Sequence, residues 1–195
     1  MNVDLRLKKE MTMLSGSDLK DIGLLDVDEN RRNFVAFIKG PSDSPFQGGF
    51  FKLAIHITPQ YPYEAPKVRF LTKIWHPNIS SQTGAICLDI LKDAWTPAFT
   101  LKSTLLSIEA LLTAAEPTDP QDAQVASQYM NNFKEYTETA AQWTAKYAKQ
   151  NILTEAEADI ASLMALGYSK NAVHNALNDN HWTKEKALQQ LKRRK

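Results

Sequence analysis

The residues best suited to chemistry are the single cysteine, Cys87, and a side-chain amide nine positions earlier, Asn78. A thiolate is a nucleophile that can hold an acyl group as a thioester. The Asn78 amide follows the stiff Pro77 and could donate a hydrogen bond to the oxyanion that forms when the acyl group is attacked. The alternative is that Cys87 is a small buried hydrophobic residue, the commoner role of a lone cysteine. Its Pro- and Gly-punctuated surroundings favour chemistry, because such segments present accessible side chains.

Metal and nucleotide sites have no support in the sequence. The four histidines and the cysteine form no Cys-x-x-Cys pair and no histidine pair one helical turn apart. There is also no Gly-rich phosphate loop and no dinucleotide-binding motif. We therefore expect no directly bound cofactor and no metal.

Composition narrows the class of partner. The 195 residues carry 23 Lys and Arg against 22 Asp and Glu, a net charge of +1, so no overall field attracts nucleic acid or an anionic membrane. One cysteine cannot form an internal disulfide and fits a reducing compartment. With no signal peptide or membrane span expected, we predict a monomer in the cytoplasm, the nucleus or both.

The first element that must support the site is predicted to be a basic amphipathic helix. Its apolar face repeats at helical spacing and consists of Val3, Leu7, Met11 and Leu14. Its cations lie largely off that face and are Arg6, Lys8 and Lys9.

Four strands are predicted next, at 22–27, 33–39, 50–57 and 67–71, because these segments are rich in β-branched and aromatic residues. Short connections dense in turn residues favour an antiparallel meander. A long loop over 75–100 follows, and Thr100 can cap a core helix that reaches about Ala114. Further helices are expected at about 121–130 and 132–149. The pattern predicts an α+β domain closing near residue 150.

A separate three-helix bundle is predicted over 154–195. Thr154 and Glu157 form a capping-box pattern at a helix start. Gly167 can end that helix, and Ser169 and Thr183 can cap two more. About forty residues lie near the lower limit for a metal-free core.

Several motifs in this order and spacing resemble those of ubiquitin-conjugating enzymes. They are Tyr-Pro-Tyr-Glu-Ala-Pro-Lys-Val at 61–68, His-Pro-Asn at 76–78, Cys-Leu-Asp-Ile-Leu at 87–91 and Trp-Thr-Pro-Ala at 95–98. Leu-Gly-Tyr at 166–168 resembles the Met-Gly-Phe or Met-Gly-Tyr signature of ubiquitin-associated domains. The combination is similar to the subclass with a C-terminal ubiquitin-associated domain, typified by the huntingtin-interacting conjugating enzyme.

The resemblance implies a ubiquitin-conjugating catalytic domain at 1–150 and a ubiquitin-associated domain at 154–195. It implies that Cys87 forms a thioester with ubiquitin and that Asn78 supports the tetrahedral intermediate of lysine attack. Asp119 matches the acidic residue that orients and helps to deprotonate the incoming amine. His76 matches a residue with a structural role in the loop, which we prefer to a general base. Transfer to lysines of substrates or of ubiquitin would build chains.

The resemblance also implies three binding surfaces. The activating enzyme, which consumes ATP, would bind Arg6, Lys8 and Lys9. Ubiquitin ligases would bind Tyr63, Thr96, Pro97 and Ala98. Ubiquitin would bind Leu166, Gly167, Tyr168, Leu188 and Leu191. The alternatives are a solvated helix face, a Tyr63 that covers the edge of the core, and a bundle that only stabilises the chain.

Two other functions compete with the transferase. A cysteine hydrolase would need His76 or another histidine within hydrogen-bonding distance of the thiol, with an orienting partner. A non-catalytic ubiquitin-binding scaffold is opposed by Cys87, because such variants of the family lack the cysteine.

Overall fold

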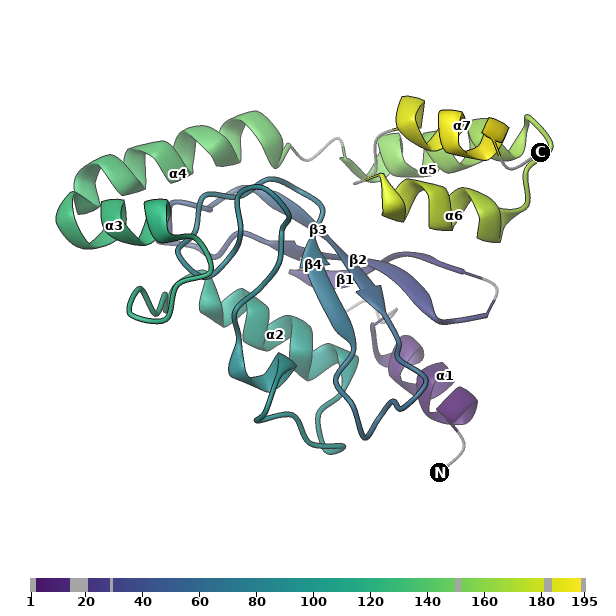
Figure 1. Cartoon of the computed structure of the whole chain (residues 1–195), viewed down its shortest axis with the longest axis horizontal. Helices are drawn as coiled ribbons and strands as arrows, with labels where there is room; N and C mark the ends of the chain where they lie inside the picture. Colours follow the sequence, from purple (N-terminus) through teal and green to yellow (C-terminus); the bar gives the residue numbers. More distant parts are fainter. Residues whose placement is uncertain (1–2, 15–20, 29, 150–151, 181–183, 194–195) are drawn as a thin grey trace.

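The computed structural model describes residues 3–14, 21–28, 30–149, 152–180 and 184–193, and it confirms the α+β fold (Figure 1). The elements are α1 (Val3–Leu14), β1 (Ile22–Val27), β2 (Asn33–Lys39), β3 (Phe50–His56), β4 (Lys67–Phe70), η1 (Asp89–Leu91), α2 (Leu101–Leu111), α3 (Ala123–Asn131), α4 (Phe133–Tyr147), α5 (Ile152–Met164), α6 (Lys170–Asp179) and α7 (Lys184–Arg193). Among these ranges, no helix has both the length and the apolar character needed to span a bilayer.

The four strands form the predicted antiparallel meander in the order β1-β2-β3-β4. Its register aligns Leu24, Ala36, Leu53 and Phe70 in one row across the sheet. Because side chains alternate along a strand, this row and its neighbours on the same face form the main core with α2. The core also takes in Leu7 and Leu14 of α1, with Val3 and Met11 packed at its edge.

The helix α2 begins where the sequence predicted. The Thr100 side chain accepts a hydrogen bond from the Ser103 N–H, and the Ser103 hydroxyl accepts one from the Thr100 N–H. This capping box satisfies two backbone donors that would otherwise lack partners at the helix start.

The three C-terminal helices have their own small core, which contains Leu163, Val173, Ala176, Leu177, Ala187 and Leu191. Gly167 ends α5 with a φ of 86°. Ser169 caps α6 by accepting a hydrogen bond from the Ala172 N–H at 3.3 Å. The predicted cap at Thr154 is wrong, because α5 already begins at Ile152 and Thr154 lies inside it. The predicted cap at Thr183 lies outside the described residues.

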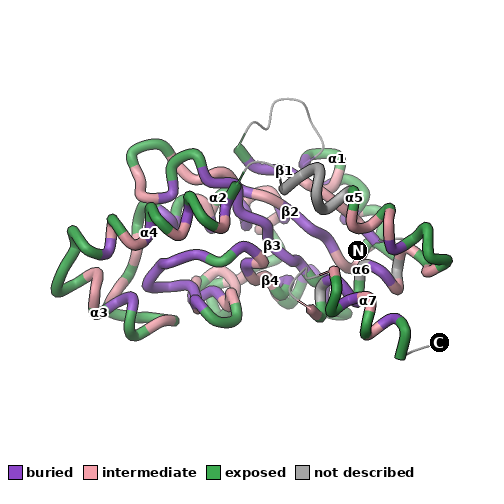
Figure 2. Tube along the Cα trace, turned by 90° about the horizontal axis from the view of Figure 1, so that it is seen from above, coloured by how far each residue is buried: buried purple, intermediate pink, exposed green. Residues whose placement is uncertain are grey.

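The bundle lies against the sheet face opposite α2 (Figures 1 and 2). The outward row of the sheet runs Asp26, Val35, Ala54, Arg69 from β1 to β4. The Lys170 Nζ of α6 is 2.9 Å from the Asp26 carboxylate. At the other end of the row, burial lowers the pKa of Arg69, and the opposite charge of Asp179 of α6 offsets part of this shift. Helix α6 therefore meets a complementary charge at each end of the row.

Candidate active site

An irregular hairpin brings Cys87 beside Asn78. The Cys87 N–H donates to the Asn78 carbonyl at 2.8 Å, and Ile79 pairs with Ile86 in an isolated antiparallel bridge. Gly84 turns the hairpin with a φ of 74°, where a β-carbon would come within 2.0 Å of the Phe70 carbonyl oxygen. Only glycine fits both this left-handed backbone and this close approach. The hairpin explains why the thiol lies nine positions after the amide in the sequence.

The Cys87 sulfur lies in polar surroundings at the edge of a cavity of about 600 Å³. Its exposed fraction is 9%, and the thiol donates to the Asp119 Oδ2 at 3.3 Å. The Lys92 Nζ donates to the sulfur at 3.1 Å. The sulfur is thus held between a carboxylate and an ammonium, in a place where a reactant can enter.

The structure corrects the expected role of Asn78. Its side-chain N–H groups both donate, to the backbone carbonyls of Glu116 at 2.7 Å and Asp119 at 3.0 Å. Its oxygen accepts from the Glu116 N–H at 2.8 Å. An amide has only two N–H donors, so neither is free here for an oxyanion. Asn78 instead holds the loop that carries Asp119.

His76 is a structural residue, as expected. It is fully buried, its Nδ1 accepts from the Asn78 N–H at 3.0 Å, and its Nε2 lies 3.0 Å from the Leu111 carbonyl. Burial lowers the pKa of His76 to about 4, so the ring is neutral at pH 7 with the proton on Nε2. Both ring nitrogens are used away from the thiol, which argues against a cysteine hydrolase.

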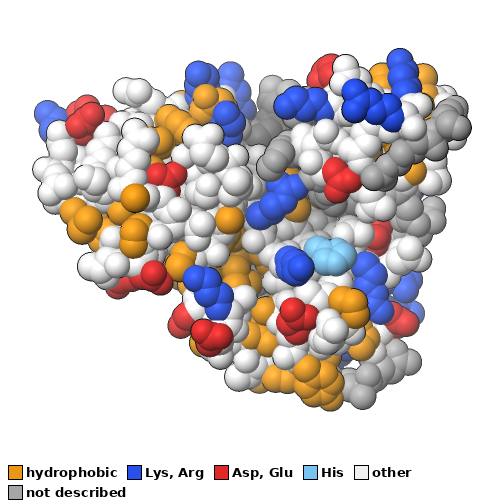
Figure 3. Space-filling view, in the orientation of Figure 1, with side chains coloured by type: hydrophobic (Ala, Val, Ile, Leu, Met, Phe, Trp, Pro, Cys, Tyr) orange, Lys and Arg blue, Asp and Glu red, His pale blue; other side chains and the backbone are white. Residues whose placement is uncertain are grey.

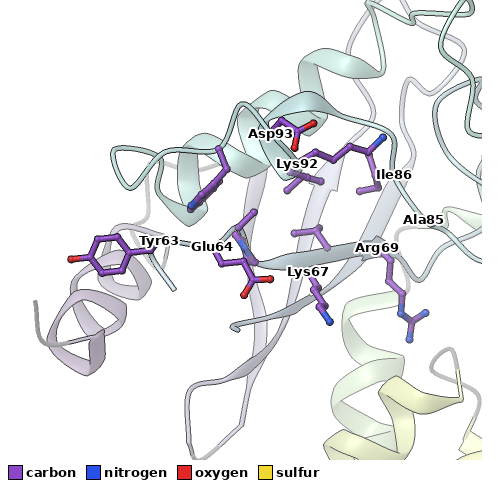
Figure 4. A pocket seen from close by; sticks show the side chains of 13 residues that line it. Tyr63, Glu64, Lys67, Arg69, Ala85, Ile86, Lys92 and Asp93 are labelled. Carbon is purple, nitrogen blue, oxygen red and sulfur yellow. The ribbon is translucent and has the colours of Figure 1, made fainter. Parts of the chain in front are cut away.

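Lys92 is the residue near the thiol that sequence reasoning missed. It lines the cavity at Cys87 and also a hollow of about 670 Å³ on the other side of the loop. Figure 4 shows it on the opposite wall of that hollow from Lys67 and Arg69 of β4. The contact with Cys87 is the main cause that raises the pKa of Lys92. The turn of η1 brings the lysine back to the sulfur, and five-residue spacing alone gives no sign of this.

The structure also corrects Arg6, which was expected on the exposed basic face of α1. Its Nε is 2.6 Å from the Glu10 carboxylate, and its Nη2 donates to the Phe99 carbonyl at 2.6 Å. Glu10 is only 4% exposed and also accepts from the Tyr61 hydroxyl at 2.8 Å and the Leu101 N–H at 2.8 Å. Arg6 is therefore committed to an internal network, whereas Lys8 and Lys9 are exposed.

Two exposed loops lie above that network. Tyr63 is 74% exposed, which excludes the alternative that it covers the core edge. The other predicted ligase-contact residues, Thr96, Pro97 and Ala98, are exposed too. The Trp95 indole N–H donates to the Pro62 carbonyl at 2.8 Å and ties the two loops together.

The predicted patch on the bundle is only partly at the surface. Leu166 and Gly167 are exposed, and Tyr168 and Leu188 are half-buried against the bundle core. Leu191 is 4% exposed and belongs to that core. Its expected contact with ubiquitin is therefore corrected, because a buried side chain offers no docking surface.

In the part of the chain that the structure describes, charge and metal-ligand chemistry add no second catalytic site. Within the described ranges, no three His, Cys, Asp or Glu side chains come together as a metal site would need. Cationic and anionic side chains are interspersed over the face in Figure 3, in keeping with the near-zero net charge.

Known proteins resemble this chain over most of its length. A family model described as "Ubiquitin-conjugating enzyme" matches residues 6–144. The chain is 51% identical to "Ubiquitin-conjugating enzyme E2 K" of Homo sapiens over 166 residues, which are 85% of this chain and 83% of the relative. It is 43% identical to "Ubiquitin-conjugating enzyme E2 27" of Arabidopsis thaliana, over 95% of this chain and 96% of that relative. A Toxoplasma gondii ubiquitin-conjugating enzyme domain of solved structure matches 75% of this chain and 99% of its own, with 48% identity and a TM-score of 0.71.

Proposed function

Because the chain belongs to the ubiquitin-conjugating enzyme family, we propose that Cys87 accepts ubiquitin as a thioester from the activating enzyme and that the ubiquitin then passes to lysine. One observation carries the assignment to this residue. The Cys87 sulfur lines an open cavity and lies 3.3 Å from the Asp119 carboxylate. A thioester formed there would face both solvent and an acidic group.

Thioester exchange needs little from the protein. One thiolate replaces another at nearly equal energy, so no hydrolase-style base is required. Transfer to lysine differs, because free lysine with a pKa near 10.4 is mostly protonated at neutral pH. The Asp119 carboxylate can accept a hydrogen bond from the entering ammonium and take up its proton. Asn78 supports this step by positioning the Asp119 loop through its bonds to Glu116 and Asp119.

The proposal is tested by mixing the chain with activating enzyme, ubiquitin and Mg-ATP, then running gels with and without a thiol reductant. We expect a one-ubiquitin adduct that the reductant removes. Replacing sulfur by oxygen in Cys87→Ser should give an adduct that resists the reductant. An adduct of Cys87→Ser that is still thiol-sensitive would contradict the assignment.

The binding surfaces form a second part of the proposal. Lys8 and Lys9 would contact the activating enzyme, and Tyr63, Thr96, Pro97 and Ala98 would contact ligases. Their exposure supports these roles. Large exposed aromatic side chains are typical anchors of protein interfaces.

The bundle is proposed to be a ubiquitin-associated domain over 154–195 that binds through Leu166, Gly167, Tyr168 and Leu188. Its separate core and the exposed Leu166 support this. A bundle that holds one ubiquitin next to the Cys87–ubiquitin thioester would favour transfer to a lysine of the held ubiquitin, which builds a chain. A monomer in the cytoplasm, the nucleus or both remains our proposal, and the single cysteine supports the reducing compartment.

A further inference from the structure

Three basic side chains share one corner of the outward sheet face. The register pairs His56 of β3 with Lys67 of β4, and it pairs Ala54 with Arg69 two positions further along. Residues two apart on a strand point to the same face, so the three basic side chains lie around the small side chain of Ala54. Figure 4 shows Lys67 and Arg69 leaving β4 on the same side.

These side chains line a cavity of about 350 Å³ between the sheet and the bundle, which we call the basic cavity. Among the described residues that line it, Asp179 of α6 is the one carboxylate. Lys67 and Arg69 are permanent cations, so two positive charges face one negative charge before the imidazole of His56 is counted. Figure 3 shows Lys and Arg side chains gathered around a histidine below the bundle.

Asp179 does not balance this positive charge. Like charges on adjacent strands repel each other, so the pattern is unfavourable unless an anion compensates it. Burial lowers the pKa of the half-buried Arg69, and the charge of Asp179 offsets only part of that shift. The Asp179 Oδ2 also accepts a hydrogen bond from the Gln190 Nε2 at 2.7 Å, within the bundle. The basic cavity therefore has charge available for a second anion.

From this geometry we propose that the basic cavity binds a phosphate group. The guanidinium of Arg69 can donate two parallel hydrogen bonds to phosphate oxygens, and Lys67 adds a point charge. The His56 ring forms the third wall, where its Nδ1 lies 2.7 Å from the Asn33 Oδ1. None of the lining residues lines the cavity at Cys87, so the site is separate from the thiol and does not depend on the proposed function.

A bound phosphate and the Asp179 carboxylate compete for Arg69. Each anion weakens the hold of the other, because such a coupling is reciprocal. Phosphate binding therefore loosens the contact between the end of α6 and β4. Conversely, removing the carboxylate of Asp179 strengthens phosphate binding, which gives the site a signature opposite in sign to simple loss of a contact.

Titration by nuclear magnetic resonance of the full ¹⁵N-labelled chain tests the inference. Sodium phosphate is added at constant pH, with sodium chloride keeping the ionic strength constant. We expect saturable shifts of the Arg69 side-chain Nε–H and of the backbone amides of Ala54 and Lys67, and none with chloride alone. A second titration with O-phosphoserine separates two sources of the group. Both probes shift these signals if a phosphorylated protein segment can bind, and orthophosphate alone does so if the site takes only the free ion.

Variants localise the site. Arg69→Gln removes the charged fork, so the dissociation constant for phosphate should rise at least about tenfold. Lys67→Gln should raise it as well, by about threefold or more. Asp179→Asn removes the competing carboxylate and should lower the dissociation constant by about threefold or more. Lys134→Gln, at an exposed lysine of α4 that does not line the basic cavity, should bind as the unmodified chain does.

Several results would overturn the proposal. One is a titration of the unmodified chain in which these signals do not saturate, or in which small shifts spread evenly over the surface. Another is unchanged phosphate binding in Arg69→Gln. If that variant does not fold, Lys67→Gln and Asp179→Asn still decide, because both residues are exposed. Unchanged binding in Lys67→Gln, or weaker binding in Asp179→Asn, would then contradict the site.

Discussion

The side-chain amide of Asn78 donates to the main-chain carbonyl of Asp119 at 3.0 Å, while the Asp119 carboxylate lies 3.3 Å from the Cys87 sulfur. The main chain of Asn78 accepts from the Cys87 N–H at 2.8 Å. One residue therefore sets the distance between the two groups proposed to act in transfer. Its importance lies in that geometry, because both of its N–H donors are already used.

Removing the Asn78 side-chain amide should slow the transfer of ubiquitin to lysine but leave the formation of the Cys87 thioester (charging) intact. In Asn78→Ala the Glu116–Asp119 loop loses three side-chain hydrogen bonds, so Asp119 is no longer held at the sulfur. We expect thioester formation to be retained and discharge to free lysine to fall about 10- to 100-fold. Single-turnover gels measure both steps. The exposed Gln82→Ala in the same hairpin is the control, and equal losses in charging and discharge would contradict this positioning role.

Replacing the Asp119 carboxylate should slow only the attack by lysine. Asp119→Asn keeps the side-chain shape but cannot take up a proton, so we expect discharge to free lysine to fall about 100-fold with charging unchanged. Asp93→Asn changes another carboxylate of the same cavity and should have little effect. A similar loss in both variants would mean that the general charge of the cavity, and not Asp119, matters.

Disturbing the hydrogen-bond network around Glu10 should lower the stability of the fold. Glu10→Gln keeps the volume but removes the charge that holds Arg6 and accepts from Tyr61 and Leu101. We expect the free energy of unfolding to fall by about 1–3 kcal/mol. Thermal unfolding should then show a midpoint lower by about 2–4 °C for each kcal/mol. Lys8→Gln, exposed on the same helix, should stay within about 0.5 kcal/mol of the unchanged chain.

The buried His76 should make the free energy of unfolding depend on pH. Its folded pKa of about 4 lies below the reference value of 6.5, so the unfolded chain binds more protons between these values. The stability that neutral His76 contributes is complete above pH 6.5 and is lost as the pH falls through about 4. The change amounts to about 3 kcal/mol.

Urea unfolding at pH 7 and at pH 4 measures that change. The stability difference between the unchanged chain and His76→Gln should shrink by this amount at the lower pH. The exposed His56→Gln should show no comparable change. If the stability difference between the unchanged chain and His76→Gln were larger at pH 4 than at pH 7, the predicted direction of the pH dependence would be wrong.

Docking of the bundle should respond to charge reversal at its ion pair. Lys170→Asp places two carboxylates opposite each other where the Lys170 Nζ now lies 2.9 Å from Asp26. We expect small-angle scattering to show a larger radius of gyration, because the bundle leaves the sheet. The double variant Asp26→Lys with Lys170→Asp should restore the compact form. Lys186→Asp, an exposed residue of α7, makes the same change in charge and should leave the radius unaltered.

Local patterns were enough for most of the secondary structure. Strands β1 and β2 have the predicted bounds, and helix α1 contains the predicted apolar face from Val3 to Leu14, since alternation and helical spacing are properties of neighbouring residues. The cap at Thr100 was likewise readable, because it depends on residues three apart. The prediction of a cap at Thr154 was wrong. The capping-box pattern is present in the sequence, but α5 begins at Ile152, two residues earlier, so Thr154 lies inside the helix. The motifs around Cys87 were readable in the same way, as residue types in a particular order.

Contacts between distant parts of the chain could not be predicted in this way. Arg6 turned inward to the Phe99 carbonyl, 93 positions away, and Leu191 turned into a core shared with α5 and α6. The side-chain amide of Asn78 donates its hydrogen bonds to a loop about forty residues further along the chain. Lys92 contacts the Cys87 sulfur because a short turn brings it back. Sequence alone determined which groups are available, because composition and periodicity are local. The packing of the whole chain decided which of them meet, because hydrogen bonds and burial depend on where remote backbone segments come to lie.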